Sequence, residues 1–393
     1  SFPECHPHHL SLPRSKKHLM KIHYSVLSFF AIALLASACS NPSEKQATGT
    51  TDAVVQPFDS ATALLFPGEK HFRNVQQLTF GGDNAEAYWS FDSKKIVFQR
   101  TDHKEVMCDQ IFFGAIPADS TQKFDFKMVS TGKGRTTCSY FMPGDSTVLY
   151  ASTHLMQDSC PPIPDREKIK KYVWPLYKSF EIYVAGLDGS IQSQLTKNKF
   201  YDAEATVSPK GDKIIFTSTR DGDLDLYTMN LDGSNVKRIT KELGYDGGAW
   251  FSPDGTKIVW RASRPTTPEA IKEYNDLLKQ DLVAPTQMTV FVADADGSNI
   301  QQVTNMPGAN WAPVFTPDGK RILFASNHEY PRGFPFNLYL INLDGTGLEK
   351  ISGSNMFDAF AMFSPDGKKL VFCSNRNNGG TRDTNVFVAD WVD

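Results

Sequence analysis

The sequence predicts an all-β fold, a six-bladed β-propeller of four-stranded blades. Three observations lead to this prediction. One β-hairpin recurs six times, a second kind of turn follows it, and the repeat spans 44 residues from Ser208 to Ser252 and 48 from Thr316 to Ser364. Repeats of four strands at this length are typical of propeller blades. One such sheet cannot bury both of its faces, so the blades must stack against one another.

The hairpin is clearest at residues 249–260, where Ser-Pro-Asp-Gly separates two apolar runs rich in β-favouring residues. Proline fixes its φ, aspartate can bond its own backbone, and glycine allows a positive φ, so this tetrapeptide predicts a tight turn. The flanking runs predict the first and second strands of a blade. The six turns begin at Ser90, Met142, Ser208, Ser252, Thr316 and Ser364.

The rest of the unit is clearest in the third copy. Residues 225–230 predict a third strand, Asp232 and Gly233 a turn, and residues 236–240 a fourth strand. The same Asp-Gly turn follows the third strand at Asp188, Asp296 and Asp344.

Ring closure is predicted from the two ends of the repeat. The sixth unit stops after a third strand at residues 385–390, whereas residues 75–79 resemble a fourth strand with no hairpin before it. We therefore expect the N-terminal strand to complete the C-terminal blade, which leaves no open edge.

The segments before the propeller have a different character. We expect residues 1–19 to be untranslated, with translation starting at Met20, and residues 20–38 to be a signal peptide ending in Ala36-Ser37-Ala38. Residues 39–68 are polar and without periodicity, which predicts a flexible tether, and residues 69–393 form the propeller. The net charge of -3 and the absence of a basic run on a predicted binding surface argue against nucleic-acid binding.

Two runs carry a resemblance to a known family. Phe-Ser-Pro-Asp-Gly-Lys-Lys-Leu-Val-Phe at 363–372 and Asp-Leu-Tyr-Thr-Met-Asn-Leu-Asp-Gly at 225–233 resemble the PD-G repeat of TolB-type six-bladed propellers, over roughly residues 72–393. Similar repeats occur in periplasmic scaffold proteins and in the propellers attached to prolyl-oligopeptidase-like peptidases. The resemblance therefore implies the fold more than the function.

The end of the signal peptide resembles a second pattern, the bacterial lipoprotein cleavage box, at residues 34–40. This resemblance implies a lipid on Cys39 and an outer-membrane lipoprotein facing the periplasm or the cell surface, held by its lipid alone. Ordinary secretion after Ala38 is the alternative. Either outcome implies a location outside the cytoplasm.

The two faces of the predicted ring differ. One carries short turns, whereas the other carries long connections at about 153–180 in the second blade and 262–286 in the fourth. The latter predicts a helix that Thr267 caps and Pro268 opens. Because long loops on a rigid scaffold often bind ligands, we expect this loop face to be functional. Alternatively, the insertions merely cover the ring.

The starts of the innermost strands should meet around the central channel on this face. We predict a binding site there for a peptide, sugar or cation, formed by Glu86, Arg135, Tyr201, Asp202, Glu204, Tyr245, Asp246, Asn310, Trp311 and Asp358. The second strands end near Arg100, His154, Arg220, Arg264, His328 and Arg376. In the alternative interpretation, each arginine pairs with an aspartate of a neighbouring blade and ties the ring together.

The cysteines suggest one disulfide in an oxidising compartment. We expect Cys138 to pair with Cys160, with Cys108–Cys160 as the next choice, and Cys373 to be a buried thiol. No cofactor is expected. Two metal sites remain as alternatives, calcium at residues 221–225, where the closing glutamate of a calcium loop is missing, and a Cys/His site using His103 or His154.

No hydrolase elbow, zinc-protease or Walker-type motif occurs in the sequence. We therefore predict a non-catalytic, monomeric, lipid-anchored envelope propeller that binds a protein or peptide partner through its loop face. The alternatives are an enzyme or module acting on carbohydrate or peptide at the channel mouth, and a propeller that serves a separately encoded peptidase.

Overall fold

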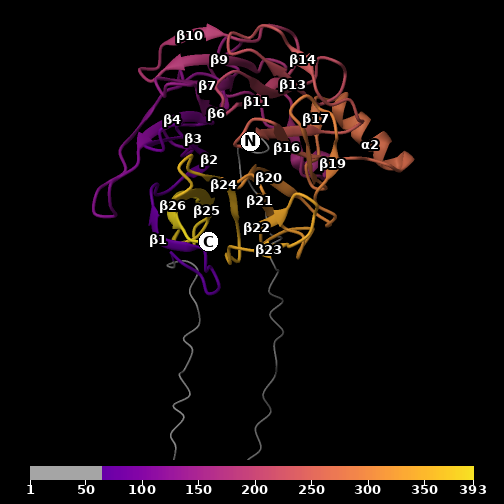
Figure 1. Ribbon diagram of the computed structural model, residues 1–393. Coiled ribbons are helices and arrows are strands. Elements are labelled where there is room, and N and C mark those ends of the chain that lie inside the picture. The colour runs from indigo at the N-terminus through magenta and orange to yellow at the C-terminus, as the bar shows by residue number, and fades with distance from the viewer. Residues whose placement is uncertain (1–63) are drawn as a thin grey trace, which may run out of the picture. The chain divides into compact units, whose positions relative to one another are not determined.

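The computed structural model describes residues 64–393 (Figure 1). The expectations for residues 1–19, the signal peptide 20–38, Cys39 and the tether up to residue 63 lie outside the described residues. Within the described chain, six four-stranded antiparallel sheets follow one another, which confirms the six-bladed propeller.

The innermost strands contact one another in a closed cycle, each with the strand of the next blade and the sixth with the first. They are β2 (Asp83–Trp89), β6 (Thr136–Phe141), β11 (Asp202–Val207), β15 (Asp246–Phe251), β20 (Asn310–Phe315) and β24 (Asp358–Phe363). The second strands are β3 (Lys95–Thr101), β7 (Thr147–Ser152), β12 (Ile214–Ser218), β16 (Lys257–Ala262), β21 (Arg321–Ser326) and β25 (Lys369–Ser374).

The third strands are β4 (Gln110–Ala115), β9 (Glu181–Gly186), β13 (Asp225–Met229), β18 (Thr289–Asp294), β22 (Asn337–Asn342) and β26 (Asn385–Trp391). The outermost strands are short: β5 (Phe126–Met128), β10 (Ile191–Gln194), β14 (Lys237–Arg238), β19 (Gln301–Gln302), β23 (Glu349–Lys350) and β1 (Phe72–Gln77). Short outer strands limit the open edge that each blade offers to another chain.

Every innermost strand contains a bulge at the same place, where two of its residues oppose one residue of the second strand. A residue with positive φ occupies each bulge. These residues are Glu86, Cys138, Glu204, Gly248, Ala312 and Phe360. Only one of the six is a glycine, so the blade repeats an unfavourable backbone conformation five times. A bulge changes the direction of the side chains that follow, and here it lets Glu204 reach the next blade.

The ring closes as predicted. β1 pairs antiparallel with β26, with Phe72 opposite Trp391 and Gln77 opposite Phe387, and Figure 1 shows these indigo and yellow strands side by side. The packed chain begins before the expected boundary at residue 69, because Phe66 is buried and the guanidinium of Arg376 lies over its ring.

Glu69 and Arg376 form the centre of this closure. Arg376 donates hydrogen bonds to the Glu69 carboxylate at 2.8 and 3.1 Å and to the Leu64 carbonyl at 2.9 Å. The other donors to Glu69 are the backbone N–H groups of Phe66 and Gly353. Burial nevertheless raises the pKa of Glu69.

The two long insertions meet each other. The helix α2 (Pro268–Leu278) begins where predicted, with the Thr267 hydroxyl accepting a hydrogen bond from the Ala270 N–H at 3.2 Å. The insertion of blade 2 contains a single helical turn, α1 (Arg166–Ile169), and the strand β8 (Trp174–Pro175), which pairs with β17 (Leu282–Val283) of the blade 4 insertion. None of the helices described here is long and apolar enough to cross a membrane.

Candidate functional site

The ten residues predicted to form the channel mouth are all buried. None has more than 6% of its surface exposed, and the largest value belongs to Trp311. The structure does bring them to the inner part of the ring, on the six innermost strands or directly before them. It does not present them to solvent.

Three of the arginines pair with aspartates of their own blades, so the alternative of pairs between neighbouring blades is wrong for these three and holds within residues 64–393 for Arg135 alone, described below. Arg220 binds Asp202 at 2.8 Å, Arg264 binds Asp246 at 2.6 Å, and Arg376 binds Asp358 at 3.2 Å. The sheet register explains this arrangement, because each aspartate lies opposite the last residue of the second strand and the arginine follows two residues later. The repeated pairing holds together the two inner strands of one blade.

A different group links blades 3 and 4. The Glu204 carboxylate accepts hydrogen bonds from the hydroxyls of Tyr201, at 3.0 Å, and Tyr245, and from the Gly248 N–H at 2.8 Å. Arg261 lies 3.2 Å from the same carboxylate and donates to the Tyr245 hydroxyl at 2.6 Å. Burial raises the pKa of Tyr201 well above its usual value, which keeps the phenol as a donor. This buried network is a structural connection between blades.

Asp246 shows how strongly the interior acts on these carboxyls. Burial raises its pKa to about 7, although Arg264 and the Trp260 indole N–H, at 2.6 Å, both stabilise the charged form. Burial also raises the pKa of Asp225, the first residue of β13, to about 6.

The remaining predicted residues are held in similar ways. Arg135 pairs with the buried Asp109 of blade 1. The Asn310 amide donates to the Met288 carbonyl at 2.8 Å, and the Trp311 indole donates to the Pro285 carbonyl at 3.0 Å. Glu86 lies in the bulge of β2 and is 2% exposed.

Trp174 of the blade 2 insertion explains why the predicted mouth is closed. Its ring lies 5.5 Å from the ring of Trp311 and 6.3 Å from that of Tyr245, and the Arg261 guanidinium lies 5.8 Å from it. The indole is completely buried. The paired strands β8 and β17 hold it in place, so these insertions cover the inner ends of blades 4 and 5.

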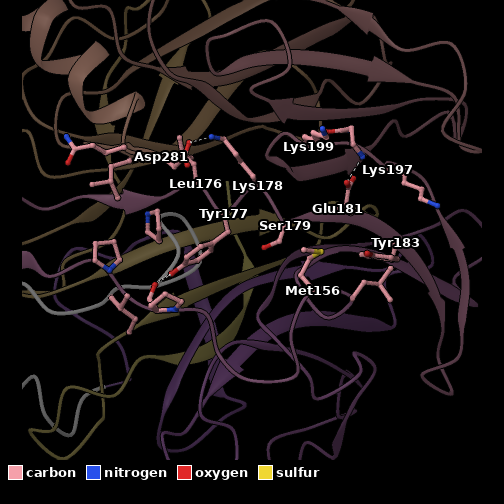
Figure 2. Close-up of a pocket in the computed structure, with 18 of the residues that line it drawn as sticks. Met156, Leu176, Tyr177, Lys178, Ser179, Glu181, Tyr183, Lys197, Lys199 and Asp281 are labelled. Atoms are coloured by element: carbon pink, nitrogen blue, oxygen red, sulfur yellow. Dashed lines mark hydrogen bonds and ion pairs between the residues drawn. The ribbon is translucent and has the colours of Figure 1, made fainter.

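A large open cleft lies elsewhere on the loop face, with a volume of about 1030 Å³ (Figure 2). The blade 2 insertion, the connection from blade 2 to blade 3 and the end of the blade 4 insertion all line it. Its apolar wall has unusually exposed side chains, with Leu155 64%, Met156 72% and Ile163 60% exposed. Three such side chains along one cleft indicate a surface that binds another molecule.

The other wall of the cleft is polar and basic. Lys178 pairs with Asp281 at 2.8 Å, which joins the two insertions, whereas Lys197 and Lys199 form no ion pair within the described chain. Figure 2 shows Lys197 and Lys199 on the same side of the cleft as Glu181.

Glu181 is the one buried acid in this wall, 7% exposed. Its Oε1 accepts a hydrogen bond from the Asn198 N–H at 2.6 Å, but its Oε2 has no hydrogen-bond partner among the described residues. Burial raises the pKa of Glu181. An acceptor without a donor in such a place is costly to the free protein.

The disulfide that anchors the apolar wall is Cys108–Cys160, so the expected Cys138–Cys160 pair is wrong. Cys138 occupies the bulge of the innermost strand β6 and is buried next to the Thr137 hydroxyl, whereas Cys160 belongs to the exposed insertion. Cys108 immediately precedes β4 on the loop face and is therefore the cysteine within reach. Cys373 is a buried thiol, as predicted, and burial raises its pKa to about 12.

Within residues 64–393 no group of three or more His, Cys, Asp or Glu side chains is arranged to hold a metal ion. The carboxylates of the calcium-like segment have other partners. Asp221 accepts a hydrogen bond from the Tyr227 hydroxyl at 2.5 Å, and Asp223 from the Tyr274 hydroxyl and the Gly244 N–H.

Fold and site together define a class of protein: a PD-G propeller whose channel is covered on the loop face and which carries a cleft on its second blade. The family model of the TolB beta propeller domain, PD40, matches residues 163–273 and 283–386, more than half of the chain. The chain therefore belongs to this family.

The comparison of structures agrees on the fold. TolB from Acinetobacter baumannii has 17% sequence identity and a TM-score of 0.51, over 77% of this chain and 64% of that one. An oligogalacturonate lyase from Vibrio parahaemolyticus has 14% identity and a TM-score of 0.49, over 80% of this chain and 79% of that one. At 17% identity, the match to TolB shows a shared fold only. No curated protein sequence matches the chain.

The sequence pointed to the loop face but missed the residues that line the cleft. Glu181 and Lys197 lie at positions that are also charged in blade 3, where Asp225 and Lys241 stand, so the repeat does not single them out. Lys199 has Leu243 as its counterpart there. The lengths of the insertions at 153–180 and 262–286 were the available signal, because both insertions line the cleft.

Proposed function

We propose that this protein is an exported, lipid-anchored, non-catalytic propeller of the cell envelope that binds a segment of a protein partner in the cleft of blade 2. The observation that carries the proposal is the cleft itself, with about 1030 Å³ of space and three strongly exposed apolar side chains beside it. This position supports a binding function better than the channel mouth does, because Trp174 and the buried ion pairs fill the latter.

The proposed location rests on the sequence. The run that ends in Ala38 and Cys39 supports export and a lipid on Cys39. Labelling cells with a fatty-acid analogue tests this part, because the label should appear on the wild type and be absent from Cys39→Ala.

The binding part is tested with a photo-crosslinking amino acid at Met156 in cells. We expect it to capture one envelope partner, and we expect Leu155→Asp to abolish the capture. A crosslinker at Ile300, which is 42% exposed on a turn of blade 4, provides the matched control and should capture nothing specific. Equal capture from both positions, or none from Met156, would contradict the proposed binding site.

A further inference from the structure

The residues that line the cleft restrict the chemistry of its ligand further than the volume of the cleft does. One wall offers apolar side chains and the other offers two ammonium groups that form no ion pair within residues 64–393. A buried carboxylate oxygen of Glu181 also has no donor among these residues. Each of these features would be complemented by a different chemical group on the ligand. Together they restrict what the ligand can be.

The two lysines would be complemented by a negatively charged group on the ligand. Lys197 and Lys199 both lie in the connection between blades 2 and 3 and line the cleft. The acids that line the cleft are already engaged on the protein side, since Asp281 pairs with Lys178 and Glu181 is bound through Oε1. A ligand carboxylate would therefore meet uncompensated positive charge.

Glu181 can accept a hydrogen bond from an N–H group of the ligand. Its Oε2 is buried and has no donor within the described chain, while its other oxygen is held by the Asn198 backbone. A fatty acyl chain has no donor to offer, whereas an extended peptide offers a backbone N–H at every second position on one side. Because Oε2 is buried in the free protein, the side chains that cover it must change rotamer on binding, as side chains at binding surfaces commonly do.

We propose that the ligand is an acidic segment of polypeptide, bound in extended form. It places apolar side chains against Leu155, Met156 and Ile163, pairs a carboxylate with Lys197 or Lys199, and donates one backbone N–H to Oε2 of Glu181. This inference rests on the proposed function and specifies the chemistry of the partner segment.

The test uses three synthetic peptides with leucine at alternate positions and glutamate, lysine or serine at the others, titrated against the full chain by fluorescence anisotropy. We expect the glutamate peptide to bind at least about tenfold more tightly than the lysine peptide at low salt, with a smaller difference at high salt. The double variant Lys197→Glu with Lys199→Glu should remove this preference. Lys237→Glu changes an exposed lysine of β14 and should not.

The Glu181 contact needs its own variant. Glu181→Gln has the same shape and can keep the Asn198 hydrogen bond, but an amide that accepts there presents N–H where Oε2 was. We expect about tenfold weaker binding of the glutamate peptide with an unchanged or higher Tm. Methylating peptide nitrogens one at a time should identify a position that weakens binding to the wild type but not further to Glu181→Gln.

The outcomes are distinct. Tighter binding of the lysine peptide would overturn the acidic class, and an unaffected Glu181→Gln would overturn the backbone contact. If no peptide binds while the Met156 crosslink persists, this inference fails and the proposed function stands. If the Met156 crosslink also fails, the proposed function is contradicted, and this inference, which rests on it, fails with it.

Discussion

The polar groups at the centre of the ring and those in the cleft of blade 2 are built in opposite ways. At the centre, Glu204 is surrounded by Tyr201, Tyr245, Arg261 and backbone donors, all supplied by the protein. In the cleft, Lys197 and Lys199 have no ion pair within the described chain and Glu181 keeps one oxygen without a donor. Both oxygens of the Glu204 carboxylate accept hydrogen bonds in the free protein, whereas only one oxygen of the Glu181 carboxylate does within the described chain.

The difference teaches how to interpret charged residues in a repeat. A carboxylate that recurs in blade after blade at the same register position meets the same neighbours each time, so its partner is built into the repeat. Asp202, Asp246 and Asp358 follow this rule. For a charged residue that occurs in one blade only, beside an insertion, the repeat supplies no partner inside the protein.

The largest expected effect comes from breaking the complete region. Glu204→Ala leaves the Arg261 guanidinium buried without its carboxylate, which should lower the free energy of unfolding by about 3–5 kcal/mol. Urea unfolding measures the change. Glu242→Ala, on the exposed connection before blade 4, is the control and should change the same quantity by less than about 0.5 kcal/mol. If Glu204→Ala abolished partner capture at unchanged stability, the centre of the ring would regain its role as the binding site.

A smaller effect is expected from loosening the cleft. Cys160→Ser removes the disulfide to Cys108, which closes a loop with a sequence separation of 52, and should lower the free energy of unfolding by about 2–4 kcal/mol. Hydrogen exchange should increase in residues 153–176 and stay unchanged in β11 and β15. Reduced wild-type protein should behave in the same way. Faster exchange throughout the ring would show that the two regions are not independent.

The third effect is a pH dependence of stability, which is the smallest of the three within any single pH unit. The pKa of Asp246 is about 7 in the folded protein and about 4 in the unfolded chain, so the folded protein binds this proton more tightly. Its contribution to stability is complete below pH 4 and is lost as the pH rises to 7, at up to about 1.4 kcal/mol per pH unit.

The matching variant isolates this contribution. Asp246→Asn carries no titrating group, so the difference in unfolding free energy between wild type and variant should change between pH 4 and 7 and stay constant above pH 8. Urea midpoints at a series of pH values measure it. A difference independent of pH would mean that Asp246 is ionised throughout, as an ordinary exposed acid would be.

The fold could be predicted because each blade is specified locally. Ser-Pro-Asp-Gly or a variant of it marks the hairpins, and an Asp-Gly turn marks the third and fourth strands in four blades. These turns are local, so no contact between distant residues is needed to recognise them. Closure by β1 was predictable because the last blade visibly lacked one strand.

The site could not be predicted in the same way. Whether Cys160 meets Cys108 or Cys138 depends on which end of which strand lies under the insertion. Whether the channel mouth is open depends on where Trp174 comes to rest, and this follows from a two-residue pairing between insertions of different blades. The sequence identifies Glu181 only as an acid at the start of a strand and does not reveal its burial or its hydrogen bonds.

The closure of the ring also decides how the protein responds to mechanical load. Any pull carried by the chain preceding residue 64 meets the Leu64 carbonyl, the ring of Phe66 and the carboxylate of Glu69 before it reaches the strand β1. All three are held by the single guanidinium of Arg376. The force is therefore taken up at a compact point in the last blade, and the hydrogen bonds that keep the circle closed are shielded from it.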